Sequence, residues 1–181
     1  DMHDAFMFES TGLIEVGRHC TTEELNPLFR HPSALTEPSD DVRDAVNSIC
    51  VDPHDVSLWV SAMSDFLAQP FVYQSGATNV STTATEALKL GRGVSQDYAH
   101  IAISMCRQVG IPARYVNGFM IGEGATHAWI EYYDNGAWMA FDPTNNKAVD
   151  DNYIKIAQGR DFNDCSINRG RFCGITQQSI N

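Results

Sequence analysis

The sequence lacks long apolar runs and has few basic residues. No apolar stretch approaches the 18 or more residues of a membrane-spanning helix, so we expect no membrane-embedded segment. Twelve Lys and Arg stand against 23 Asp and Glu, giving a net charge of −11. An acidic chain of this kind is poorly suited to nucleic-acid phosphates or anionic membrane surfaces, so neither is an expected partner.

Cysteine occurs without a disulfide or zinc pattern. The number of cysteines is odd, no two of them form a CxxC motif, and no histidines lie at zinc-finger spacing from them. The five are Cys20, Cys50, Cys106, Cys165 and Cys173. A reduced, cytoplasmic setting is the expectation, since thiols persist in that compartment. We expect no metal and no cofactor.

The 181 residues have the length and apolar content (43%) of one compact domain. Residues 5–17 (AFMFESTGLIEVG) predict one or two short strands around a Ser-Thr-Gly turn. They have no obvious sheet partners nearby, so we assign residues 1–17 to the end of a preceding β-rich unit. Residues 18–38 are polar and contain three prolines, which is typical of a connection, and residues 39–181 form the main core.

Helix signals come first in this core and strand signals follow. The four predicted helices begin after Ser39, after Asp55, at the Thr83–Glu86 capping box and at about Ser95. Three segments with the apolar pattern of strands come next, at residues 113–121, 127–133 and 137–142. This order predicts an α+β fold with a mainly antiparallel sheet.

The last two strands predict where two polar side chains meet. Asn135-Gly136 suits a type I′ hairpin turn, because both positions need a positive φ. A two-residue turn pairs residue 134 with residue 137, and hence Trp129 with Asp142. His127 and Asp142 then share one face as diagonal neighbours, roughly 7–8 Å apart at Cα. A three-residue loop would put them on opposite faces, whereas a four-residue loop would restore the same face.

A histidine backed by a carboxylate is a base with a fixed tautomer, and it needs a nucleophile. A helix start favours one, because its free N–H groups stabilise an anion and hold an oxyanion. The segment Gly93-Val94-Ser95-Gln96-Asp97 lies at the start of the fourth predicted helix. Ser95 is therefore the candidate.

Three blocks, in this order, carry a family resemblance: GRGVSQDYAHIAISMCRQVGIPARYVNGF, HAWIEYYDNGAWMAFDPT and GRDFND. They strongly resemble the transglutaminase-like superfamily over about residues 70–175, closest to its microbial cysteine-protease branch. The resemblance implies a papain-like core, with the central helix packed on an antiparallel sheet and residues 39–181 as the catalytic unit. It also implies a Cys-His-Asp triad, which falls on position 95, His127 and Asp142.

Other site residues follow from the same resemblance. The family stabilises the oxyanion with an upstream side-chain donor and the backbone N–H of the nucleophile, for which Tyr73 is the candidate donor. Gln96 is a second candidate through its backbone N–H, with its side chain expected to cap the helix. Trp129 shares the His127 face and is a candidate for the wall of the substrate cleft. Simple core packing is the alternative for Tyr73 and Trp129.

Position 95 departs from the family, which has cysteine there. A thiol at a helix start beside an imidazolium ionises near neutral pH, whereas a hydroxyl does not. Three explanations stay open: an introduced cysteine-to-serine change that inactivates the protein, a natural serine in a weak or inactive homologue, or a working serine hydrolase.

The implied reaction is acyl transfer at an amide, in which a thiolate attacks and a thioester is captured by water or an amine. We expect capture by water, hence peptide or isopeptide hydrolysis, with a peptide or protein substrate. The alternatives are transglutaminase cross-linking of amines to glutamine and a non-catalytic peptide-binding module. The sequence leaves the natural substrate and the oligomeric state open.

The resemblance gives minor expectations for the remaining polar residues. Arg114 and the Gly159–Asp161 segment are expected to form structural ion pairs. Asp161 and Asp164 are a weak calcium candidate, because no cluster of oxygen ligands accompanies them. Apart from the resemblance, Cys165 and Cys173 lie eight residues apart in a predicted loop-like tail, where a disulfide or a metal site is a minor alternative. The family also carries a β-rich unit before this core, so we expect a chain trimmed from a longer protein.

Overall fold

The computed structural model describes residues 11–17, 20–122 and 125–166. Within these ranges the helices are η1 (Pro27–Arg30, 3₁₀), α1 (Asp40–Asn47), α2 (Val56–Leu67), α3 (Ala84–Leu90), α4 (Ser95–Gln108) and α5 (Phe162–Cys165). The strands are β1 (Cys20–Thr21), β2 (Val72–Tyr73), β3 (Arg92–Gly93), β4 (Ala113–Met120), β5 (Thr126–Asp134), β6 (Ala137–Asp142), β7 (Lys147–Ala148) and β8 (Tyr153–Gly159).

The helices begin where the sequence places their caps. Ser39 accepts the Val42 N–H at the start of α1. Thr83 and Glu86 form the expected capping box of α3, which ends at Gly91 in the left-handed conformation. These local contacts satisfy N–H groups that have no partner inside the helix, so the predicted helix starts are confirmed.

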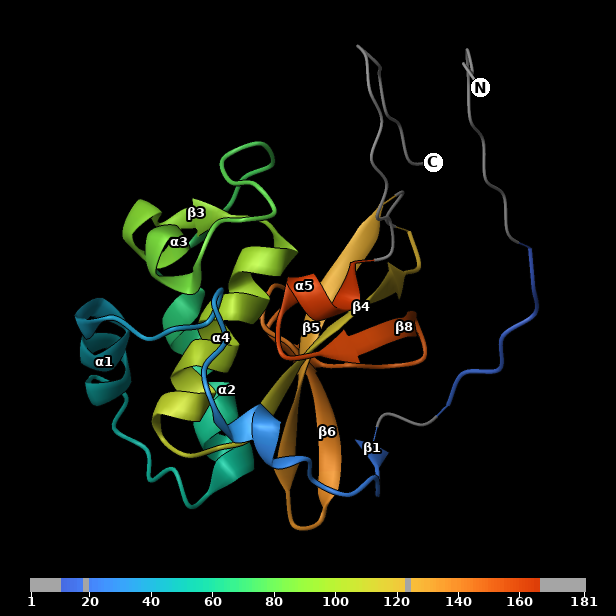
Figure 1. The fold of residues 1–181 in the computed structure, drawn as a ribbon, viewed down its shortest axis with the longest axis horizontal. Helices are drawn as coiled ribbons and strands as arrows, with labels where there is room; N and C mark the ends of the chain where they lie inside the picture. The colour runs from blue at the N-terminus through green and yellow to red at the C-terminus, as the bar shows by residue number, and fades with distance from the viewer. Residues whose placement is uncertain (1–10, 18–19, 123–124, 167–181) are drawn as a thin grey trace.

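The structure has an antiparallel sheet on one side and helices on the other, as Figure 1 shows. The main sheet has the order β1-β6-β5-β4-β8, with β7 paired to β6. Helix α4 lies between the sheet and the outer helices, contacting α1, α2 and α3 as well as β4 and β5. Its side chains from Ile101 to Met105 are fully buried. The expected central helix on an antiparallel sheet is confirmed.

The β5–β6 hairpin has the predicted register. Asn135 and Gly136 both have positive φ, at 47° and 85°, as a type I′ turn requires. The ladder pairs Asp134 with Ala137 and continues without a shift to Ile130 opposite Phe141. His127 and Asp142 therefore lie on the same face of the sheet.

The segment before α1 differs from the sequence expectation. Residues 11–17 form no strand, and residues 5–10 lie outside the described residues. The predicted connection at 18–38 instead supplies β1, which pairs antiparallel with β6, and η1. Short edge strands of this kind are missed because two residues carry no readable period.

The end of α4 is tied to distant parts of the chain by one buried arginine. The guanidinium of Arg107 donates to the carbonyl oxygens of Phe29, Ala113 and Arg160 and to the Thr36 hydroxyl. Burial lowers the pKa of Arg107 to about 10, still well above neutral pH. The far end of α4 is thus fixed, which leaves its N-terminal end in a defined position against the sheet.

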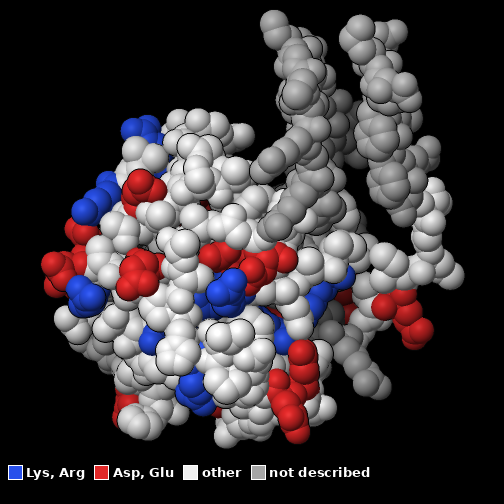
Figure 2. Space-filling view, in the orientation of Figure 1, with Lys and Arg blue, Asp and Glu red and all other residues white. Residues whose placement is uncertain are grey.

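On the face shown in Figure 2, acidic and basic side chains are interspersed among uncharged ones. No helix of the described residues combines the length and the hydropathy needed to cross a membrane.

Candidate active site

Ser95 is the first residue of α4, and a tight local arrangement holds it there. Asp97 Oδ2 accepts the backbone N–H of Val94 at 2.7 Å, which closes the first turn. Gly93 makes room for this carboxylate, because a Cβ at that position would lie 2.4 Å from Asp97 Oδ2. The geometry at the start of α4 is thus set locally: Gly93 leaves space, and Asp97, four residues later, caps the helix.

The same carboxylate ties the first turn of α4 to a preceding loop. The Thr78 hydroxyl donates to Asp97 Oδ2 at 2.6 Å. Asp97 is buried, and its Oδ1 has no hydrogen-bond partner among the described residues. Burial raises the pKa of Asp97, although the bonds from Thr78 and Val94 oppose the shift.

His127 and Asp142 form a buried pair in the position that the hairpin dictates. His127 Nε2 lies 2.7 Å from Asp142 Oδ2, with the histidine 1% exposed and the aspartate 0%. An ionised carboxylate only accepts hydrogen bonds, so Nε2 carries the proton and donates it. Nδ1 is then the ring nitrogen that can accept a proton from a nucleophile.

Asp142 is surrounded by donors. Tyr153 and Asn145 donate side-chain hydrogen bonds to the same Oδ2, each at 2.7 Å. The other oxygen, Oδ1, accepts the backbone N–H groups of Thr144 and Asn145 at 2.9 and 3.3 Å. Burial opposes ionisation of Asp142, but the bonds and the attraction of His127 outweigh it and lower the pKa of this carboxyl.

The start of α4 meets the hairpin beside the histidine. Ser95 Oγ accepts the backbone N–H of Ala128, the residue after His127, at 3.3 Å. Ser95 is only 7% exposed, so this contact lies in a site of low dielectric, where charges interact strongly. The contact places the side chain of position 95 against the strand that carries His127.

Aromatic rings enclose the imidazole. Trp129 lies two residues further along β5, nearly parallel to the His127 ring with centroids 6.4 Å apart. Tyr153 packs edge-on against Trp129 and also contacts His127, at 5.4 and 5.9 Å between centroids. Trp129 is 1% exposed, so it packs behind the histidine. Its role as a cleft wall stays a prediction.

The two oxyanion candidates lie near the start of α4. Tyr73 is on β2, opposite Gly93 of β3, and is 52% exposed. Gln96 follows Ser95, and its side chain donates to the Val80 carbonyl at 3.3 Å. The expectation that this side chain caps α4 is therefore wrong, because Asp97 provides the cap. The oxyanion roles of Tyr73 and Gln96 stay predictions.

The sequence reasoning missed Asn145 and Tyr153. Asn145 had a usable signal, since an Asp followed by Pro, Thr and Asn predicts a turn in which the aspartate accepts nearby N–H groups. Tyr153 had none, because it comes from β8, whose antiparallel pairing with β4 was not predicted.

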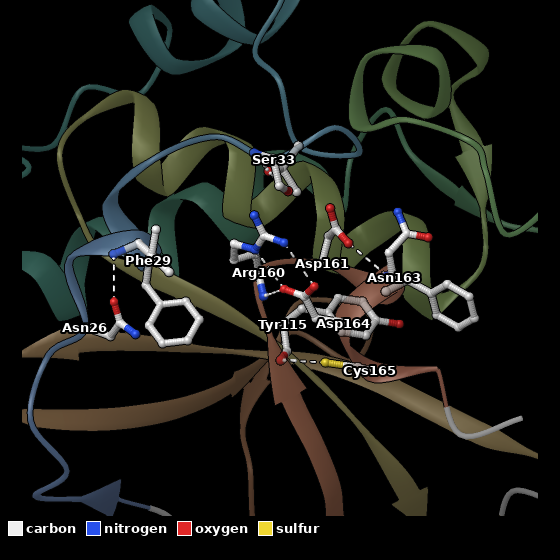
Figure 3. Close-up of polar contacts among 12 residues, drawn as sticks. Asn26, Phe29, Ser33, Tyr115, Arg160, Asp161, Asn163, Asp164 and Cys165 are labelled. Carbon is white, nitrogen blue, oxygen red and sulfur yellow. Dashed lines mark hydrogen bonds and ion pairs between the residues drawn. The ribbon is translucent and has the colours of Figure 1, made fainter. Parts of the chain in front are cut away.

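The minor candidates are structural where the structure describes them (Figure 3). Asp161 accepts the Asn163 N–H at the start of α5, and Asp164 pairs with Arg160 at 2.8 Å. Cys165 ends α5, is 1% exposed and lies 3.8 Å from the Tyr115 carbonyl oxygen, so the predicted loop-like tail is wrong at this residue. Cys173 lies outside the described residues. Arg114 forms the expected ion pairs, with Glu131 and Glu23.

Comparison with known proteins agrees with this architecture. Residues 43–143, more than half of the chain, match the family model of the transglutaminase-like superfamily. The chain belongs to this superfamily.

Its relatives include uncharacterised mycobacterial proteins. The chain is 33% identical over 153 residues to one from Mycobacterium leprae, covering 79% of this chain and 54% of the relative. It is 39% identical over 126 residues to one from Mycobacterium tuberculosis, and this match covers 61% of this chain and 40% of the relative. The chain thus spans about half the length of the relatives it matches.

A solved structure is similar over most of the chain. The crystal structure of "a Putative Cysteine Protease from Cytophaga hutchinsonii" matches with a TM-score of 0.71 and 31% identity. The match covers 80% of this chain and 51% of that one.

Proposed function

We propose that this chain carries the active-site framework of an enzyme that transfers acyl groups from amides, most simply a peptide or isopeptide hydrolase. Position 95 is the nucleophile, His127 the base and Asp142 the group that orients it. The observation that carries the proposal is the 2.7 Å bond between His127 and Asp142. The residue after His127, Ala128, contacts Ser95. Membership of the superfamily and the similar structure titled "a Putative Cysteine Protease" support it.

The chemistry follows from the positions of these groups. Nδ1 of His127 takes the proton of the nucleophile, which then attacks the amide carbon. Asp142 stabilises the imidazolium that forms, and the imidazolium returns the proton to the leaving amine. The N–H groups of the first turn of α4, with Tyr73 as the second donor, hold the oxyanion.

Serine at position 95 makes this chain slow or inactive in the proposal. A hydroxyl keeps its proton near neutral pH, so it depends on the base during attack. A thiolate at a helix start beside an imidazolium is instead formed in advance. The same active-site residues would serve either a water or an amine as the final acceptor, so cross-linking of amines to glutamine is the second candidate.

The Ser95→Cys variant tests the proposal. At pH 6 we expect iodoacetamide to label the thiol introduced at position 95 at least about 10-fold faster than the exposed free thiol of Cys50. Peptide mapping measures both sites in one sample, so Cys50 is an internal control. Adding His127→Ala should bring the two rates together.

A peptide library with and without a labelled primary amine then separates the two reactions. Peptide cleavage by the Ser95→Cys variant supports hydrolysis, and incorporation of the amine supports cross-linking. Peptide binding with neither reaction, together with labelling no faster than Cys50, would overturn the enzyme proposal in favour of a binding module.

A further inference from the structure

Three side-chain donors converge on one oxygen of Asp142. His127 Nε2, Tyr153 Oη and Asn145 Nδ2 each lie 2.7 Å from Oδ2. A fully buried carboxylate oxygen with three donors is held in one orientation, and its charge is shared among them. How strongly Asp142 attracts the proton on His127 therefore depends on the other two donors.

Tyr153 reaches this oxygen from the edge of the sheet. It begins β8, where it pairs with Met120 at the end of β4. Gly118 allows the close approach, because a Cβ there would lie 2.0 Å from the Ile154 carbonyl oxygen and 2.6 Å from the Trp129 ring. The missing side chain at position 118 thus lets β8 and Trp129 close over the histidine.

Tyr153 remains a donor throughout the accessible pH range. Burial and the adjacent Asp142 carboxylate raise the pKa of its phenol well above the usual value. The other charged groups near it are Lys147, whose Nζ lies 5.2 Å from the ring centre, and Asp150, which pairs with Lys147. Asp150 also raises the pKa of the phenol, but less than burial and the Asp142 carboxylate do.

We propose that Tyr153 is a positioning residue of the His127–Asp142 pair: its hydroxyl fixes Asp142 Oδ2 against the imidazole and moderates the charge that the imidazole meets. This role rests on the proposed function. Two effects follow when the hydroxyl is removed. Asp142 loses part of its restraint, and its less-shared charge favours the protonated ring more strongly.

The first experiment uses the Ser95 protein and needs no activity. The ¹H–¹⁵N signals of the His127 ring are followed against pH in the parent protein and in Tyr153→Phe. We expect the ring to take up its second proton at a pH higher by about half a unit in the variant. Tyr132→Phe is the matched control, because it removes a phenol hydroxyl that contacts Ser57 on the opposite face of β5. It should leave the titration unchanged.

The second experiment uses the Ser95→Cys background and the best peptide of the library. Tyr153→Phe should lower kcat about 10-fold and leave KM within about twofold, since the lost hydrogen bond orients the base and does not bind substrate. Tyr132→Phe should change neither constant.

Asn145→Ala provides a second test in case the Tyr153→Phe variant does not fold. Asn145 is exposed and donates to the same oxygen, so its loss should move the ring titration in the same direction. An unchanged titration in Tyr153→Phe, or in Asn145→Ala if only that variant folds, overturns the positioning role. A shifted titration without any peptide turnover by Ser95→Cys supports the positioning role and contradicts the proposed function alone.

Discussion

The site contains two buried carboxylates, and burial affects them differently. Asp97 is 1% exposed and Asp142 0%. The pKa of Asp97 is raised because burial dominates, with two donors on Oδ2 and no partner for Oδ1 among the described residues. The pKa of Asp142 is lowered because donors on both oxygens outweigh the same burial penalty. Hydrogen-bond donors, more than depth, decide which buried carboxylate keeps its charge.

The opposite pKa shifts of Asp97 and Asp142 match the different roles of the two carboxylates. Asp97 closes the first turn of α4 and ties it to Thr78, which needs an acceptor and not a charge. Asp142 faces a base that must become positive during the proposed reaction, so its charge is required. Three substitutions test this contrast, in order of decreasing expected effect.

Asp142→Asn in the Ser95→Cys background should lower kcat about 10⁴-fold. The amide can present an N–H to His127 Nε2, which favours the wrong tautomer of the ring and removes the charge that stabilises the imidazolium. Single-turnover kinetics with the library peptide measures the loss, and circular dichroism checks the fold. Asp97→Asn in the same background is the control, expected within about threefold of the parent. A loss below tenfold for Asp142→Asn would remove Asp142 from the mechanism.

Thr78→Val should lower the free energy of unfolding by about 2 kcal/mol, because the buried Asp97 carboxylate then loses one of its two donors. Urea unfolding at pH 7 measures the change. Thr85→Val is the matched control, since the Thr85 hydroxyl donates to the neutral carbonyl of Glu37 at the surface. Equal losses in the free energy of unfolding would show that the Thr78–Asp97 bond contributes no more than a surface hydrogen bond to a neutral carbonyl.

Asp97→Asn should have the smallest effect, and a pH-dependent one. The raised pKa means that folded Asp97 binds its proton more tightly than the unfolded chain does, so its contribution to stability is present below pH 3.8 and is lost as pH rises through the folded value. Asparagine does not titrate and can still accept from Thr78 and Val94. Urea unfolding from pH 4 to 7 should therefore show the variant gaining stability relative to the parent. A relative loss with rising pH would mean that the charge of Asp97 is stabilising.

The features that the sequence predicted are those set by neighbours in the chain. The α3 capping box needs only Thr83 and Glu86, three residues apart. The face shared by His127 and Asp142 needs only the two-residue turn at Asn135 and Gly136, since side chains alternate along both strands. In these cases the determining contacts span a few residues, so residue type and spacing are sufficient.

The features that were missed depend on distant segments. Nothing near Tyr153 indicates that β8 pairs with β4 and brings a phenol to Asp142. The two residues of β1 carry no pattern, yet they pair with β6. The Gln96 side chain caps no helix because the Val80 carbonyl lies within its reach. Each of these contacts joins segments that are distant in the chain, so residue spacing gives no sign of it.

The family, the helix starts, the hairpin register and the sheet face shared by His127 and Asp142 could all be predicted from the residues alone. Two features depend on packing between distant segments. Tyr153 of the edge strand β8 reaches Asp142 where Gly118 has no side chain, and the first residue of α4 lies against the strand that carries His127. Hydrogen bonds between near neighbours in the chain follow from residue spacing, whereas the donors that set the charge of a buried group come from whichever segments pack around it.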